Sequence, residues 1–262
     1  MSAIQHLSAL NASFDKIFVI TLERAHDRHA NIATSLAGVD YELVYGVDKR
    51  NLDLESLRRS GDYLPRRAAK LNRYSKERQL PLGCIACSLS HRAVYQRMID
   101  GGHATALVFE DDVLPIADNL PVLARAIGEL PANWELLYLG YITNERPISA
   151  LRAQYYRMLY SVWPNHVYRW RPKDVARLFP RPFSPLLYRA GYHNCTHAYA
   201  LTRGAAQKLI DAQTPVSYCS DSVLTHHVLR KRLEAFSVRR QLFTQLDFVH
   251  GHQASTSYIN SD

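Results

Sequence analysis

The chain has few cysteines and no long apolar run. Four cysteines among 262 residues do not make a disulfide scaffold, because such scaffolds belong to short, cysteine-rich secreted chains. The apolar runs at 17–20 and 106–109 are far short of the roughly 20 residues that a membrane-spanning helix needs. The first residues also lack the cationic start and apolar stretch of a secretory signal. We therefore expect a cytoplasmic protein that could contact a membrane only at its surface.

Acidic residues are also relatively few, at 24 against 32 lysines and arginines, which gives a net charge of +8. A basic surface attracts anions such as nucleic acid, phosphorylated small molecules or an acidic membrane. The sequence has no RNA-recognition, zinc-finger or P-loop signature, which disfavours nucleic acid as the partner. Hydrophobic residues make up 47% of the chain, close to ordinary globular usage, so a sizeable core can form.

Short apolar runs alternate with segments of helical spacing, which predicts an α/β fold with ligands at the carboxyl ends of its strands. Strands are expected at 16–21, 41–45, 105–109, 134–139 and 199–201. Helices are expected at 30–36, from Ser88 or Ser90 to Gly101, at 120–127, at 203–211 and at 220–233. The helix capped by one of these serines should carry its apolar positions on one face, namely Leu89, Ala93, Val94 and Met98.

Two segments depart from this alternation. Residues 49–79 are polar and rich in arginine and lysine, which predicts a mobile helical or loop insertion. Residues 144–189 hold six prolines among arginines and aromatic side chains, which predicts a long functional loop. Its 163–189 part could stack bases and neutralise phosphates, or cover a sugar ring while holding an anionic acceptor.

Three consecutive carboxylates, Glu110-Asp111-Asp112, follow an apolar strand directly. They repel one another unless a positive group lies there, and a hard divalent cation such as Mg²⁺ or Mn²⁺ is the natural partner. Because side chains of an extended segment alternate, we expect Glu110 and Asp112 to point the same way and Asp111 elsewhere. The alternative is an acidic turn or helix N-terminus after the strand.

Other residues suggest chemistry less specifically. Cys84 and Cys87 have the spacing of a zinc half-site, but no second pair exists, so we interpret them as small buried residues before a helix. His252 could reach a metal site from the C-terminal segment, although a solvated tail is the alternative. Arg24 and Arg28 follow the first strand, where a nucleotide would lie, or are ordinary surface arginines.

Taken in order, several segments resemble glycosyltransferase family 25. Residues 18–24, continuing to Arg28, resemble the family's opening strand and arginine loop, and 83–91 resemble its G-E-I-G-C-x-L-S-H block. Residues 106–113 resemble its E-D-D-V block, 196–203 its T-x-x-Y-x-x-S-R segment, and Asp221 stands where the family has a P-V-D aspartate. Gln245 and the closing His252-Gln253 also fit. Three positions differ, since Cys84 replaces Glu, Ala86 replaces Gly and Ser220 replaces Val, and 144–189 matches no block.

The resemblance implies a GT-A-like nucleotide-sugar-binding fold, with a central mixed, mostly parallel sheet flanked by helices. It implies a single domain over 1–262, with a donor-nucleotide half at about 15–112 and an acceptor half at 113–262. Donor binding is expected of Thr21, Leu22, Arg24, Arg28, Ser90, His91 and Asp111. Glu110, Asp112 and His252 would hold Mn²⁺ or Mg²⁺, and Asp221 would act as the base. The alternatives are helix capping for Asp221 and a hydrogen bond inside the core for His91.

The function that we expect is an inverting, metal-dependent transfer of a hexose from a UDP-sugar to a glycan acceptor. Galactose is favoured over glucose as the transferred sugar. An example of the acceptor is lipopolysaccharide core at the inner face of the cytoplasmic membrane. The arginine-rich segments would then hold a phosphorylated glycolipid or an anionic membrane surface. One alternative is a non-catalytic module that binds nucleic acid or acidic membrane, against which the three carboxylates argue. Another is a family member that has lost its activity, which the Cys84 departure suggests.

Overall fold

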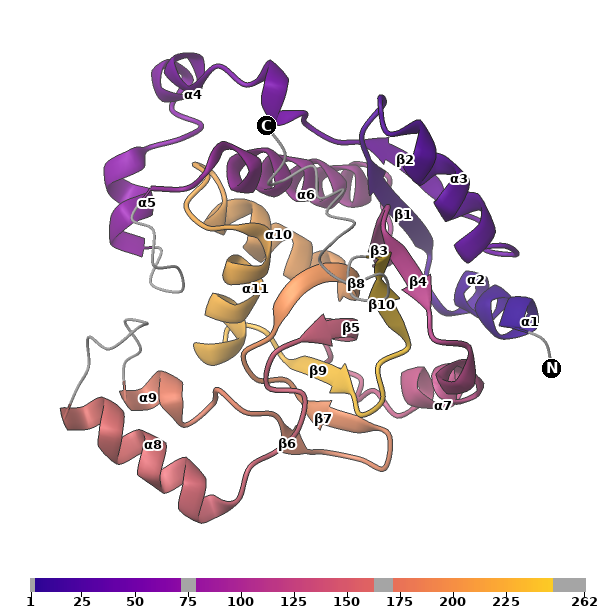
Figure 1. Ribbon diagram of the computed structural model, residues 1–262, viewed down its shortest axis with the longest axis vertical. Helices are drawn as coiled ribbons and strands as arrows, with labels where there is room; N and C mark the ends of the chain where they lie inside the picture. Colours follow the sequence, from indigo (N-terminus) through magenta and orange to yellow (C-terminus); the bar gives the residue numbers. More distant parts are fainter. Residues whose placement is uncertain (1–2, 72–78, 163–171, 247–262) are drawn as a thin grey trace.

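A mixed eight-stranded sheet forms the centre of the computed structural model, which describes residues 3–71, 79–162 and 172–246 (Figure 1). The strand order is β2-β1-β3-β8-β5-β9-β7-β6. These strands are β1 Lys16–Thr21, β2 Glu42–Tyr45, β3 Thr105–Glu110, β5 Leu136–Ile142, β6 Arg181–Pro182, β7 Leu187–Arg189, β8 Asn194–Thr202 and β9 Ala235–Val238. A small second sheet pairs β4 (Val113–Pro115) with β10 (Phe243–Gln245).

The pairing of the central strands decides which residues meet at one edge of the sheet. β1 is parallel to both β2 and β3, with Ile20 opposite Glu110. β8 runs antiparallel between β3 and β5, so its first residues lie at the same edge as the carboxyl ends of those two strands. Their side chains are almost completely buried, as expected of a sheet covered on both faces.

Helices cover both faces of the sheet and confirm the predicted α/β class. In Figure 1, α6, α10 and α11 lie on one side and α1, α2, α3 and α7 on the other. The α-helices are α1 Ala3–Ser8, α2 Leu10–Ser13, α3 His26–Ser35, α4 Leu54–Ser60, α5 Pro65–Leu71, α6 Leu82–Asp100, α7 Leu123–Gly128, α8 Ala150–Val162, α9 Pro172–Val175, α10 Arg203–Ala212 and α11 Ser220–Leu229. Two 3₁₀ helices are η1 Lys49–Asn51 and η2 Ala117–Val122.

The long helix α6 begins at Leu82, six residues before Ser88 and eight before Ser90, the two predicted caps. Pro81 is its N-cap residue, and extended backbone there leads directly into the helix. The hydroxyl groups of Ser88 and Ser90 donate instead to the carbonyls of Tyr218 and Ala86, both at 2.8 Å. The prediction that these serines start the helix is therefore wrong, and both cysteines lie inside α6. The expected apolar face is also wrong at Ala93, which is exposed.

The predicted loop at 144–189 contains the 13-residue helix α8. All six prolines of that segment lie outside Ala150–Val162, so nothing in this stretch prevents helix formation.

The polar 49–79 segment contains η1, α4 and α5, in keeping with the expected helical insertion. The last predicted helix ends at Leu229 and not at Leu233, because Lys231 adopts a left-handed conformation with φ of 55°. Within the described ranges, no helix is both long and apolar enough to cross a membrane.

Candidate active site

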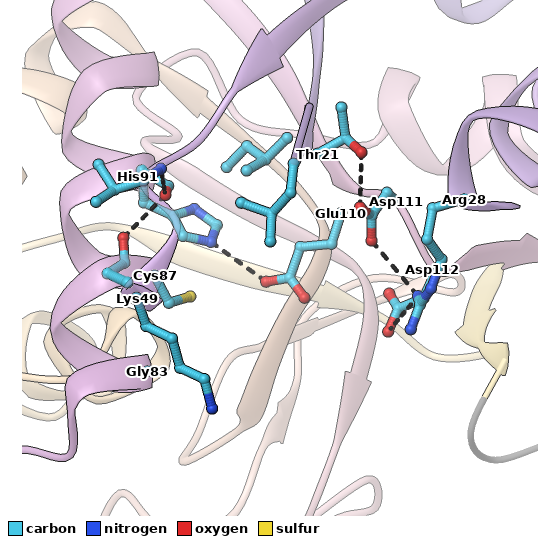
Figure 2. A pocket seen from close by; sticks show the side chains of 14 residues that line it. Thr21, Arg28, Lys49, Gly83, Cys87, His91, Glu110, Asp111 and Asp112 are labelled. Carbon is cyan, nitrogen blue, oxygen red and sulfur yellow. Dashed lines mark hydrogen bonds and ion pairs between the residues drawn. The ribbon is translucent and has the colours of Figure 1, made fainter. Parts of the chain in front are cut away.

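A pocket lies where β1 and β3 end, against the first turns of α6 (Figure 2). It contains every predicted donor residue except Arg24, together with the three consecutive acids. The lining residues are Ile20, Thr21, Leu22, Arg28, Val47, Lys49, Gly83, Ala86, Cys87, Ser90, His91, Glu110, Asp111 and Asp112. The sheet register thus brings together side chains that are up to 92 positions apart in the sequence.

Arg28 lies between two of the acids and is only 3% exposed. Its Nη1 is 3.4 Å from Asp111 Oδ1 and 3.4 Å from Asp112 Oδ2. The Thr21 hydroxyl donates to Asp111 at 2.7 Å, and the Gln245 amide donates to Asp112 at 3.2 Å. The strand ends at Glu110, so side-chain alternation does not continue. The expectation that Asp111 points away from Asp112 is therefore wrong.

Glu110 points in another direction, toward His91 on α6 (Figure 2). Its Oε1 accepts from the Thr196 hydroxyl at 2.5 Å and lies 3.2 Å from His91 Nε2. The Nδ1 of His91 is 2.7 Å from the Tyr199 hydroxyl, which is 2.9 Å from that of Tyr95. Burial by itself raises the pKa of Glu110, but the hydrogen bond and charge of His91 outweigh it, so the pKa lies below its ordinary value.

Asp112 has the most perturbed carboxyl group of the three. Burial, followed by the negative charge of Glu110, raises its pKa from 3.8 to about 7. Burial also raises the pKa of Asp111. Asp111 and Asp112 thus face one buried guanidinium while Glu110 faces His91, and carboxylate oxygens are the hard ligands that Mg²⁺ and Mn²⁺ prefer. These residues fit a divalent cation, for which Glu110 and Asp112 would supply oxygens. His252 lies outside the described residues.

The raised pKa of Asp112 predicts a pH-dependent stability when chelator is present. The folded form binds the Asp112 proton more tightly than the unfolded form, so this stabilisation is lost as pH rises from about 4 to above 7. We expect Asp112→Asn to remove that loss, so that its Tm between pH 5 and pH 8 falls less than that of the wild type by roughly 5–10 °C. Thermal unfolding in EDTA measures this difference, and equal slopes for both proteins would refute the assignment.

A second group of potential ligands joins Cys87, His91 and Glu110, whose ligand atoms all lie within 4.8 Å of one another. Burial and the nearby charge of Glu110 raise the pKa of the Cys87 thiol well above 9, and a protonated thiol is a poor ligand. Both ring nitrogens of His91 also have hydrogen-bond partners. The carboxylates therefore fit a cation better than this trio. Cys84 and Cys87 lie inside α6 and form no disulfide with each other.

Asp221 lies in the first turn of α11, beside the pocket but not in its lining. It is not the N-cap residue, which is Cys219. Its carboxylate accepts hydrogen bonds from the Ser222 hydroxyl at 3.2 Å and from the backbone of Cys195. Burial raises the pKa of Asp221, which suits a group that must take up a proton.

Ser220 connects Asp221 to the pocket. Its hydroxyl is 3.3 Å from that of Thr196, which binds Glu110, and 3.2 Å from the Cys87 sulfur. Neighbouring residues of β8 therefore contact both Glu110 and Asp221. The Thr196 hydroxyl donates to Glu110, and the backbone of Cys195 donates to Asp221. Thr196 was part of a recognised sequence block but was not predicted as a site residue.

Arg24 is the one predicted donor residue of the described chain that does not line the pocket. It forms an ion pair with Asp48, which in turn accepts from the backbone of Arg50 at 3.0 Å and caps η1. The hydrogen bond from Arg24 holds the pKa of Asp48 below its ordinary value. Arg24 thereby fixes the loop that brings Lys49 to the pocket. Lys49 was not predicted as a site residue from the sequence. It follows the second parallel strand closely, and ligands of α/β sheets bind at the carboxyl ends of such strands.

Comparison with known proteins gives a consistent family. The profile described as "Glycosyltransferase family 25 (LPS biosynthesis protein)" matches residues 14–224. "Inactive glycosyltransferase 25 family member 3" of Homo sapiens is 32% identical over 206 residues, covering 76% of this chain and 29% of the relative. The rat protein named "Probable inactive glycosyltransferase 25 family member 3" is 35% identical over 207 residues, covering 76% and 30%. "Procollagen galactosyltransferase 2" of Mus musculus is 28% identical over 205 residues, covering 76% and 28%. The chain thus spans less than a third of these relatives.

Proposed function

The chain belongs to glycosyltransferase family 25, and from that premise we propose that it transfers a hexose, with galactose favoured, from a UDP-sugar to a glycan acceptor. The observation that carries this proposal is the pocket at the carboxyl ends of β1 and β3, where three carboxylates lie beside Arg28 and Lys49. Its lining residues all fall between 20 and 112, which supports a donor half at about 15–112 and an acceptor half at 113–262.

The donor's diphosphate needs positive groups, because charge develops on it as the bond to the sugar breaks. Arg28 and Lys49 are the cationic side chains that line the described pocket, and we assign them to the phosphates and nucleotide. Mn²⁺ or Mg²⁺, held by Glu110 and Asp112, would stabilise the same charge when bound. His91 and Thr196 position the Glu110 carboxylate through their hydrogen bonds.

Transfer with inversion is a single displacement at the anomeric carbon. The acceptor oxygen forms a bond to that carbon, the bond to the diphosphate oxygen breaks, and the proton of the acceptor hydroxyl passes to Asp221. The raised pKa of Asp221 brings its proton affinity closer to that required of a base near neutral pH. The hydrogen bond from the Cys195 backbone orients the carboxylate.

Purified protein with Mn²⁺ and a panel of UDP-hexoses tests the proposed function directly. We expect slow donor hydrolysis, faster release of UDP in the presence of acceptor glycans, and UDP binding detectable by calorimetry. Galactose should be the preferred sugar. The absence of both turnover and UDP binding with every donor in the panel would overturn the proposal.

A non-catalytic role is the second candidate, because relatives of this chain bear the word "inactive" in their names. Cys84 also replaces the family's usual glutamate. However, Cys84 does not line the pocket, so its effect on donor binding would be indirect. UDP binding without any hydrolysis or transfer would favour this candidate over the enzyme.

We also propose that α8 contacts an anionic membrane surface on which a glycolipid acceptor is presented. Apolar side chains on its outer face are exposed, including Leu151 and Val162 at 81% each and Met158 at 62%. They recur at helical spacing, so they form one stripe. Residues 146–189 contain nine lysines and arginines but one acid, Asp174, which is buried and paired with Arg230. This combination of apolar stripe and positive charge is typical of helices that lie on acidic membranes.

Replacement of the three α8 residues Leu151, Met158 and Val162 by serine should weaken binding to phosphatidylglycerol vesicles by about tenfold or more, because their apolar area no longer enters the lipid. Vesicle sedimentation measures this binding, with neutral phosphatidylcholine vesicles as the reference. Leu64→Ser, at a position 41% exposed on another part of the surface, is the matched control. Equal vesicle binding by wild type and the triple variant would remove α8 from this role.

A further inference from the structure

A second cavity, of about 270 Å³, lies between α8 and the ends of β5 and β8. Four aromatic side chains line it, namely Tyr156, Tyr160, Phe179 and Tyr192, together with the amides of Asn144 and Asn194. None of the lining residues that the structure describes is charged. The volume is just below the range of about 300–1,000 Å³ that is typical of pockets for drug-sized ligands, so it suits a single small ring.

Tyr156 and Phe179 stack against each other in the wall of this cavity. Their ring centroids are 5.7 Å apart and their planes differ by 23°, a stacked arrangement. The guanidinium of Arg152 lies 5.8 Å from the Tyr156 ring centroid, and its Nη2 donates to the Tyr156 hydroxyl at 3.4 Å. These contacts limit the motion of Tyr156, so little ordering is needed when a ligand binds.

The backbone around this cavity is held in an uncommon conformation. Thr143, Asn144 and Cys195 have φ values of 67°, 50° and 69°, a region that residues other than glycine rarely adopt. His193 fixes this geometry, because its Nδ1 is 3.0 Å from the Thr143 carbonyl oxygen and its ring packs 4.3 Å from that of Tyr141. Such strain persists only where surrounding contacts enforce it, and it often marks a binding site.

The cavity is linked to the proposed base through β8. Asn194 lines it, and the next residue, Cys195, hydrogen-bonds to Asp221 through its backbone. All the lining residues fall between 143 and 194, whereas those of the donor pocket fall between 20 and 112. The two cavities thus come from different halves of the chain, and β8 carries the contacts that link them to Asp221.

We propose that this cavity binds one neutral pyranose ring of the acceptor glycan, with a hydroxyl directed toward Asp221. A pyranose has an apolar C–H face that packs on aromatic rings, which matches the stacked Tyr156 and Phe179. Its hydroxyls can donate to the amide oxygens of Asn144 and Asn194, whose amide nitrogens already donate to protein oxygens. The lack of charge among the described lining residues favours a neutral sugar over a phosphorylated or acidic one. This inference rests on the proposed function, because the cavity can be an acceptor site only if Asp221 is the base of the transfer.

Saturation-transfer NMR with methyl β-D-galactopyranoside, methyl β-D-glucopyranoside and methyl α-D-mannopyranoside, in the presence of UDP, tests the inference. We expect at least one glycoside to receive saturation in the wild type and to bind about tenfold more weakly to Tyr156→Ala. Tyr156→Phe keeps the ring and should retain most of the binding. Tyr155→Ala removes a neighbouring tyrosine that is 56% exposed and should bind like the wild type.

UDP calorimetry on the same four proteins separates the two proposals. If UDP binds but no glycoside shows binding that depends on Tyr156, the acceptor cavity is refuted while the proposed function stands. If glycoside binding falls equally in Tyr155→Ala and Tyr156→Ala, the cavity is likewise refuted. If UDP does not bind, the proposed function fails, whereas glycoside binding that depends on Tyr156 would still support the cavity as a sugar site.

Discussion

Asp221→Asn should reduce hexose transfer by about 10²- to 10⁴-fold, the usual contribution of a general base, while leaving UDP affinity unchanged. Asparagine has nearly the same shape as aspartate, and its side-chain oxygen can still accept from the Cys195 backbone. It cannot take up the proton of the acceptor hydroxyl, so the loss should appear in the chemical step. Initial rates of transfer and UDP calorimetry on the same preparation measure the two effects.

Ser222→Ala is the matched control for Asp221→Asn. It removes the 3.2 Å hydrogen bond to Asp221 but keeps the carboxylate, so we expect its transfer rate to stay within about tenfold of the wild type. Equal Tm values for both variants and the wild type would exclude a folding defect. Full transfer by Asp221→Asn would remove the base assignment, and loss of UDP affinity would place Asp221 in the donor site instead.

Asp112→Asn should abolish the activation of transfer by Mn²⁺, with a rate loss of about a hundredfold or more, because the cation stabilises the developing charge of the leaving group. A neutral amide is a much weaker ligand for a hard cation than a carboxylate. The titration of activity against Mn²⁺, together with direct Mn²⁺ binding followed by electron paramagnetic resonance, measures the effect.

Asp111→Asn provides a close control for Asp112→Asn. Both residues lie 3.4 Å from the same Arg28 nitrogen, so each substitution removes one negative charge beside the same guanidinium. We expect Asp111→Asn to keep its response to Mn²⁺, with weaker donor binding as its main defect. If Asp112→Asn remains fully activated by Mn²⁺, the ligand assignment is wrong. If only Asp111→Asn loses the response, the cation is held by Asp111 and not by Asp112.

Local sequence patterns predicted several elements well because each depends on neighbouring residues. The apolar runs at 16–21 and 105–109 lie in strands, as expected. The α10 helix also begins at Arg203, as predicted. Proline gave a misleading signal at 144–189, since its frequency there obscured the proline-free stretch that forms α8. The cap of α6 was misplaced because Ser88 and Ser90 use their hydroxyls for contacts within and beyond the helix.

The sequence by itself determined the family, the α/β class and the placement of three acids at a strand end, because apolar runs and ordered motifs are local features. Only the tertiary structure decided how those acids are used. Arg28 joins Asp111 to Asp112, whereas Glu110 pairs with His91 and Thr196. The Thr196 contact depends on the insertion of β8 between β3 and β5, whereas the Arg28 and His91 contacts depend on how α3 and α6 pack beside β1 and β3. No periodicity within a segment encodes the order of strands in a sheet, so neither these contacts nor the aromatic cavity beside Asp221 could be found from the sequence.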